Sequence, residues 1–314
     1  MSFDPTSDVL PAARQALYDR ARSFRIAARL LTAEDADDAA LTYALCREAD
    51  DLVDEAPSAA VAAVAIGELR AELHGQRSPR PLVVAFYRMA LRRGLPVHAV
   101  WELVDTLAAD AGPVRIADDS ALFRYSYGVA GTVGLLMGNL LGARGEGANA
   151  CAVDLGIGMQ ISNIVRDVTE DAGRDRVYLP SSRLHSVGLR AEDVANGSAD
   201  PASIAIVCRD LVALSDRYYA SARGGLRFLP LRGRIAVAVA ASLYQAIGHA
   251  VVRRGVEALK QRTVLSRFSL GLAFVRGVLT LARPTVWWGR HGRHPALHPF
   301  VLGPAEPGHH CPTA

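Results

Sequence analysis

QISNIVRDVTED, residues 160–171, places Asn163, Asp167 and Asp171 four residues apart within an otherwise apolar run. Residues four apart stand on the same face of an α-helix, one above the other. The stretch therefore predicts a helix that carries a ladder of oxygen ligands on one face and packs its remaining faces into a core.

CREADDLVDE, residues 46–55, repeats this pattern with Asp50 and Asp54. A single pair of acidic residues four apart more often marks a solvated helix face. Both clusters here are interleaved with aliphatic side chains, and buried carboxylates are costly unless they are paired or coordinate a metal. Because two such helices can face each other across a bundle interior, we expect both ladders to serve one internal site.

Arginines accompany both ladders. Arg47 and Arg166 each precede an acidic ligand by one to three residues. Guanidinium groups bind phosphate oxygens through paired hydrogen bonds, and Mg²⁺ prefers carboxylate oxygens that it shares with substrate phosphates. An ordinary ion pair with a neighbouring Asp is the alternative role for each arginine, and the two roles are compatible. The combination suits magnesium and a diphosphate.

Helical periodicity dominates the chain, and strand-like alternation is nearly absent. We expect a single all-α domain over residues 1–283 and a poorly packed tail, rich in Pro, Gly and His, over residues 284–314. Residues 173–197 are the most loop-like internal stretch. The expected helices are 12–31, 35–53, 59–73, 81–92, 97–110, 120–141, 148–171, 201–228, 234–261 and 266–281.

Composition narrows the partners and the compartment. The chain has 314 residues, half of them hydrophobic, and a net charge of +3 without a basic run interleaved with aromatics, so nucleic acid is not expected. The four cysteines are scattered, which fits a reducing compartment. The first residues do not form a signal peptide, and no run of eighteen apolar residues is present. We expect a cytoplasmic protein that is free or peripheral on the inner membrane.

The expected helix 120–141 is rich in glycine. Gly131, Gly134, Gly138 and Gly142 fall on one face, and each interior glycine costs roughly 1 kcal/mol relative to alanine. A close crossing with another helix would explain them, and so would a groove for a long apolar ligand. Both explanations stay open, and they are compatible.

Taken together, these motifs resemble the head-to-head prenyl synthases, the family of phytoene, dehydrosqualene and squalene synthases. The resemblance runs in order over roughly residues 20 to 270. It implies an all-α fold of the isoprenoid synthase type with a central prenyl-binding cavity. The matching segments are Ser23-Phe24, residues 43–47 (YALCR), Asp54-Glu55, residues 125–134 (YSYGVAGTVG), residues 160–171 and residues 176–180 (RVYLP).

The resemblance also implies a reaction. One allylic diphosphate ionises, the double bond of a second molecule attacks the cation, and proton loss gives a cyclopropylcarbinyl diphosphate. A second ionisation and rearrangement then join the two C1 carbons. The family pattern assigns magnesium, with Mn²⁺ as a possible substitute, to Asp50, Asp54, Asn163, Asp167 and Asp171. It assigns catalytic roles to Arg47, Tyr127, Gln160, Arg166, Tyr178 and Tyr244, and substrate contacts to Ser23, Phe24, Tyr43, Val133, Gly134 and Arg176.

We expect two molecules of geranylgeranyl diphosphate as the substrates. They would be joined, by way of prephytoene diphosphate, to give phytoene. This choice rests on overall similarity to bacterial phytoene synthases and on the small-residue helix, which leaves room for C20 tails. The alternative is a C30 synthase that converts farnesyl diphosphate to dehydrosqualene or presqualene diphosphate. No NAD(P)H is expected, because no strand precedes Gly156-Ile157-Gly158. A non-catalytic family member is the remaining alternative.

Residues 264–288 leave a further question open. The segment is apolar, is interrupted by Arg267, Arg276 and Arg283, and closes with Trp287-Trp288. It could lie along a membrane surface. It could equally be a core helix whose arginines extend to solvent.

Overall fold

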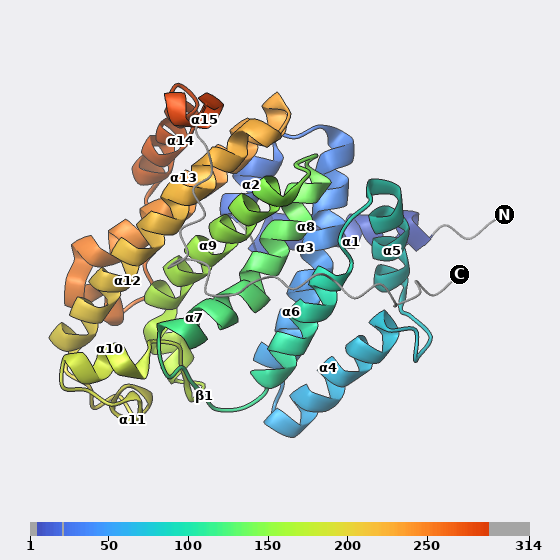
Figure 1. Cartoon of the computed structure of the whole chain (residues 1–314). Coiled ribbons are helices and arrows are strands. Elements are labelled where there is room, and N and C mark those ends of the chain that lie inside the picture. The colour runs from blue at the N-terminus through green and yellow to red at the C-terminus, as the bar shows by residue number, and fades with distance from the viewer. Residues whose placement is uncertain (1–4, 21, 289–314) are drawn as a thin grey trace.

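The computed structural model describes residues 5–20 and 22–288. Over these ranges the structure is almost entirely helical, as the periodicity predicts, and Figure 1 shows the helices gathered into one bundle. The α-helices are α1 (Pro5–Arg20), α2 (Arg22–Ala28), α3 (Ala33–Asp54), α4 (Ala59–Leu73), α5 (Pro81–Arg93), α6 (His98–Ala109), α7 (Asp119–Ser126), α8 (Thr132–Leu140), α9 (Glu146–Ala172), α10 (Ser181–Ser186), α11 (Ala191–Ala195), α12 (Pro201–Ala222), α13 (Leu231–Arg254), α14 (Arg267–Thr280) and α15 (Pro284–Trp288).

Helix α9 runs through the centre of the bundle, with α8, α12 and α13 packed against it (Figure 1). Its buried side chains are mainly aliphatic, Ile157, Ile161, Ile164 and Val165 among them. Helix α3 lies on the other side of α8, and α14 covers the outside of α13. This arrangement places the two helices with acidic ladders on opposite sides of the bundle interior.

A two-residue parallel ladder closes one end of the bundle. Strand β1 (Val114–Arg115) pairs with β2 (Arg176–Val177), so that Val114 lies opposite Arg176. The pairing holds the RVYLP segment next to the loop that leads into α7. It also places a buried tyrosine, Tyr178, beside α7, although the two are far apart in the sequence.

The expected helix 120–141 is not uniform. A π-helical turn, η1 (Tyr127–Gly131), separates α7 from α8. Similarly, the last residues of the expected helix 201–228 form a 3₁₀ turn, η2 (Arg223–Phe228), and α13 is followed by the 3₁₀ turn η3 (Gly255–Leu259). Periodicity locates such segments but does not distinguish these helix types, because a changed number of residues per turn barely alters the apolar pattern over segments of five or six residues.

Close crossing accounts for two of the central glycines. A Cβ on Gly134 would lie 2.2 Å from the carbonyl oxygen of Ala152 on α9, and a Cβ on Gly156 would lie 2.1 Å from that of Ala130. Both obstacles are backbone atoms, which side-chain rotation cannot move. The backbones of α8, η1 and α9 therefore meet at a distance that only glycine permits.

The C-terminal boundary differs from the expected one. Residues 284–288, assigned to the tail, form α15, in which Val286 is fully buried and Trp287 donates a hydrogen bond to the carbonyl of Leu281. Residues 289–314 lie outside the described residues. One helical segment, Leu231–Leu259, is long and apolar enough to cross a membrane, but half of its most apolar window is buried in the bundle, as in many core helices.

Candidate active site

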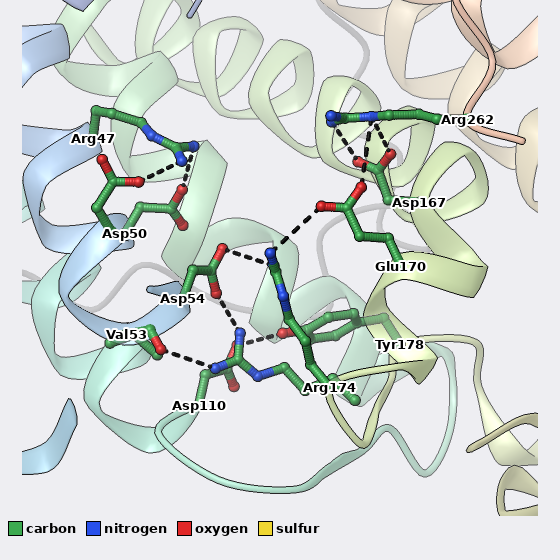
Figure 2. Close-up of polar contacts among 12 residues, drawn as sticks. Arg47, Asp50, Val53, Asp54, Asp110, Asp167, Glu170, Arg174, Tyr178 and Arg262 are labelled. Carbon is green, nitrogen blue, oxygen red and sulfur yellow. Dashed lines mark hydrogen bonds and ion pairs between the residues drawn. The ribbon is translucent and has the colours of Figure 1, made fainter. Parts of the chain in front are cut away.

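The two acidic ladders face each other across the bundle, as Figure 2 shows. Arg174, just beyond the end of α9, lies between them: its guanidinium nitrogens are 3.5 Å from Asp54 on α3 and 3.5 Å from Glu170 on α9. The buried faces of both helices are aliphatic, which fixes the rotation of each helix and turns the carboxylates inward. The ladders therefore form one polar centre.

On α3, both ladder carboxylates are bound by arginines. Arg47 Nη1 donates to Asp50 at 2.8 Å, and Arg47 also pairs with Asp51. Arg176, on β2, donates to Asp54 and, at 3.3 Å, to the carbonyl of Val53. Arg176 thus ties the RVYLP segment to the end of the first ladder.

On α9, arginines bind the middle carboxylate of the ladder, Asp167. Arg166 Nε donates to Asp167 at 2.8 Å, and Asn163 donates to Gln160 at 3.3 Å. Arg262, which follows η3, donates to Asp167 at 2.9 Å and lies 3.8 Å from Glu170. No sequence pattern points to Arg262, because no acidic ladder or family motif surrounds it.

Crowding of the carboxylates changes their pKa values. Burial, followed by the neighbouring charges of Asp167 and Asp54, raises the pKa of Asp171 to about 7. Burial and the charge of Asp54 raise the pKa of Asp50 to about 6, against the opposing effect of Arg47. Since Asp54 and Asp171 come from different ladders, their repulsion shows that the two ladders share one electrostatic environment. A cation at this centre would relieve it.

The donor set suits a hard cation, but not one held by protein alone. Within residues 5–20 and 22–288, no three His, Cys, Asp or Glu side chains gather closely enough to enclose a metal ion. Magnesium commonly binds through one or two carboxylates and completes its shell with water and substrate phosphates. Two facing rows of carboxylates, surrounded by arginines, fit such a shared site.

A cavity of about 430 Å³ opens from this polar centre into the bundle. Arg47, Asp50 and Arg166 line its polar end, together with Gln160, Asn163 and Arg262. Small and aliphatic side chains line the remainder, with Ala148 and Leu229 among them. Along α9 the lining runs from Asn163 to Ala148, fifteen residues (163 − 148 = 15) or about 22 Å of helix. The cavity therefore offers a charged end and a long apolar channel.

A pair of stacked tyrosines borders the polar end. Tyr125 lines the cavity and stacks on Tyr178 with ring centroids 4.6 Å apart. The Tyr178 hydroxyl donates to the buried carboxyl of Asp110 at 3.1 Å, and Tyr125 also hydrogen-bonds to it. The Tyr127 hydroxyl instead donates to Glu102 on α6. The geometry thus favours Tyr125 over Tyr127, the tyrosine selected from the sequence, as the residue facing a ligand.

The remaining site residues selected from the sequence divide into two groups. Tyr43, Val133, Gly134 and Tyr244 all line the cavity, which also makes the glycine helix part of a groove. Ser23 and Phe24 lie on α2, and their side chains fall outside the described part of the chain. The sequence motifs do not predict Tyr125 or Asp110 as site residues, although YSY places two tyrosines on opposite helix faces.

Comparison with known proteins gives a consistent result. A family model for squalene/phytoene synthase matches residues 17–269. A phytoene synthase of Pseudescherichia vulneris is 33% identical over 271 residues, covering 82% of this chain and 87% of the relative. A 15-cis-phytoene synthase of Paracoccus sp. (strain N81106 / MBIC 01143) is 34% identical over 284 residues, covering 86% and 91%.

Solved structures agree on the fold. A dehydrosqualene synthase in complex with a ligand superimposes with a TM-score of 0.79 at 23% identity, covering 89% of this chain and 99% of that one. A squalene synthase from Alicyclobacillus acidocaldarius gives a TM-score of 0.69 at 19% identity, covering 80% and 95%. At sequence identities this low, the similarity shows a shared fold and nothing about the reaction.

Proposed function

The chain belongs to the squalene/phytoene synthase family, and we propose that it joins two molecules of geranylgeranyl diphosphate head to head to give phytoene. The observation that carries this proposal is the cavity, whose charged end is lined by Asp50 and Asn163 of the two ladders and whose apolar channel is long. The relatives named phytoene synthase favour this substrate over a shorter one. The product belongs to carotenoid biosynthesis.

The charged end suits the departure of diphosphate. Three arginines line it: Arg47, Arg166 and Arg262. Each forms an ion pair with an aspartate of the ladders. Diphosphate oxygens can take up the same guanidinium donors, because both ligands accept paired hydrogen bonds. Bound magnesium, held by Asp50, Asp54, Asn163, Asp167 and Asp171, would supply further positive charge toward the leaving group.

The apolar channel suits the prenyl chains and the cations formed from them. Its small and aliphatic lining excludes water, which would otherwise capture an allylic cation. Tyr125 lines the cavity with Tyr178 stacked on its ring, and an electron-rich ring there stabilises positive charge. Asp110 holds both hydroxyls and so fixes the orientation of the two rings.

Incubation of the purified chain with magnesium and either geranylgeranyl or farnesyl diphosphate, without a nicotinamide cofactor, tests the proposal. Mass analysis should give a C40 hydrocarbon from geranylgeranyl diphosphate. A C30 product formed in preference would replace the proposal with the farnesyl alternative. An absence of diphosphate release from both substrates would refute the enzyme function, and a chain with Asp50→Asn and Asp171→Asn serves as the inactive reference.

A further inference from the structure

Helix α14 turns its small residues toward the bundle and its large apolar residues toward solvent, the reverse of a typical helix at the edge of a core. Its small residues Ala273 and Gly277 face inward, and a Cβ on Gly277 would lie 2.7 Å from Cα of Val239 on α13. Its large apolar residues face outward, and Phe268 is 81% exposed. The outward residues, with Val264 just before the helix, are Val264, Phe268, Leu272, Val275, Val278 and Leu279, and we call them the α14 stripe.

The α14 stripe is a single band on one side of the helix. Phe268, Leu272, Val275 and Leu279 recur every three or four residues, the spacing of one helix face. Arg267 and Arg276 stand at its two borders, both exposed. Helix α14 lies at the outer edge of the bundle, against α13 and opposite the edge formed by α4 and α5 (Figure 1).

The segment that carries the stripe is cationic. Residues 263–288 include Arg267, Arg276 and Arg283 and no Asp or Glu. An apolar helix face bordered by Arg267 and Arg276 matches the interface of an anionic bilayer, where apolar side chains enter the acyl boundary and arginines meet lipid phosphates. A second copy of the chain would present the same cations and repel them.

Three arginines meet beneath the C-terminal half of α14. Arg223, Arg276 and Arg283 line one small cavity, and across the described residues none of them forms an ion pair with a carboxylate. Burial and the charges of the other two arginines lower the pKa of Arg223. Asp216 attracts Arg223, but its oxygens are already bound by Gln245 and His249. The exposed guanidinium groups of Arg276 and Arg283 can therefore bind an anion from outside the described chain.

We propose that the α14 stripe docks on the surface of an anionic phospholipid bilayer, with Arg267, Arg276 and Arg283 on lipid phosphates. The arginine-lined cavity beneath α14 adjoins the central cavity, since Leu155, Leu226 and Val237 line both. The proposal rests on the surface of the protein and not on the identity of the substrate.

Co-sedimentation of the intact chain with vesicles tests the docking. We expect binding to phosphatidylcholine vesicles that contain phosphatidylglycerol and much weaker binding to phosphatidylcholine alone. Phe268→Ser with Leu272→Ser should lower the partition coefficient by about tenfold or more, since both side chains lose apolar burial. Arg276→Gln with Arg283→Gln should lower it about fivefold for each arginine and only on anionic vesicles.

Matched controls use residues at the opposite edge of the bundle. Val64→Ser with Leu91→Ser removes apolar side chains of comparable exposure from α4 and α5, and Arg70→Gln with Arg77→Gln removes exposed charges. Neither should change vesicle binding. An intact chain that stays in the supernatant with both vesicle types overturns the proposal. The proposal is also overturned if the stripe variant binds vesicles as well as the unchanged chain does. The same holds if the stripe substitutions abolish self-association and leave vesicle binding intact.

Discussion

Tyr125 and Tyr178 stack with ring centroids 4.6 Å apart and an angle of 19° between their planes. Tyr125 lies on α7, whereas Tyr178 follows β2, and the β1–β2 pairing brings the two segments together. Both hydroxyls bind the carboxyl of Asp110. A rigid aromatic wall therefore stands where the charged end of the cavity meets its apolar channel.

Replacing Tyr125 should harm catalysis more than replacing Tyr127. Tyr125→Phe removes a hydrogen bond to Asp110 and loosens a ring that lines the cavity, so we expect kcat to fall about tenfold to a hundredfold. Tyr127→Phe removes only a contact with Glu102 and should stay within about threefold of the unchanged chain. Steady-state diphosphate release measures both, and the reverse order would exclude Tyr125 from the site.

Asp110 should make stability depend on pH. Burial raises the pKa of its carboxyl from 3.8 to about 6, so the folded protein keeps a proton that the unfolded chain has already lost. Its contribution to the free energy of unfolding therefore falls as pH rises from about 4 to about 6, by up to about 3 kcal/mol. Asp110→Asn should reduce the slope of stability against pH in a thermal unfolding series, and Asp50 and Asp171, whose pKa values are also raised, account for a slope that remains. Asp105→Asn, on an exposed side chain, should leave the slope unchanged.

The acidic ladders should govern the requirement for magnesium. Asp171→Asn removes one oxygen charge from the shared centre, and we expect the magnesium concentration for half-maximal diphosphate release to rise about tenfold or more. A chelator should abolish release from the unchanged chain, and added magnesium should restore it. Asp105→Asn again serves as the control. An unchanged magnesium requirement in the Asp171 variant would remove this residue from the metal site.

The length of the channel should select the prenyl chain. Ala148 lines the cavity about 22 Å along α9 from Asn163, so Ala148→Phe should obstruct its far part. We expect kcat/KM for geranylgeranyl diphosphate to fall by about tenfold or more, while the value for farnesyl diphosphate changes little. A parallel loss with both substrates would indicate general damage instead, and circular dichroism of the variant would then detect it.

The crossing of α8 and α9 should be intolerant of any side chain. A Cβ at Gly134 meets the backbone oxygen of Ala152 at 2.2 Å, so Gly134→Ala should lower the free energy of unfolding by about 1–3 kcal/mol. Gly67, within α4, has nothing within 4 Å of a Cβ, and Gly67→Ala should raise it by about 0.5–1 kcal/mol. Urea unfolding measures both variants, whose free energies of unfolding should change in opposite directions. Destabilisation by both would point to another cause.

Much of the fold follows from local properties of the sequence. The period of apolar residues predicts helices because each helix must bury one face, and the expected helix 148–171 agrees with α9 within two residues at its start. The same period cannot detect the π turn at Tyr127–Gly131, which depends on close packing against α6 and α9. It also cannot tell which of several apolar faces is left exposed, as on α14.

The sequence by itself determined the helical class, the two acidic ladders and the arginines beside them, because spacing along one helix is fixed by the geometry of that helix. Only the tertiary structure decided that Tyr125 rather than Tyr127 lines the cavity, since residues two apart point to opposite sides and packing selects between them. Likewise, Arg174 and Arg262 join the site from loops, whose positions depend on the whole bundle and not on a local period.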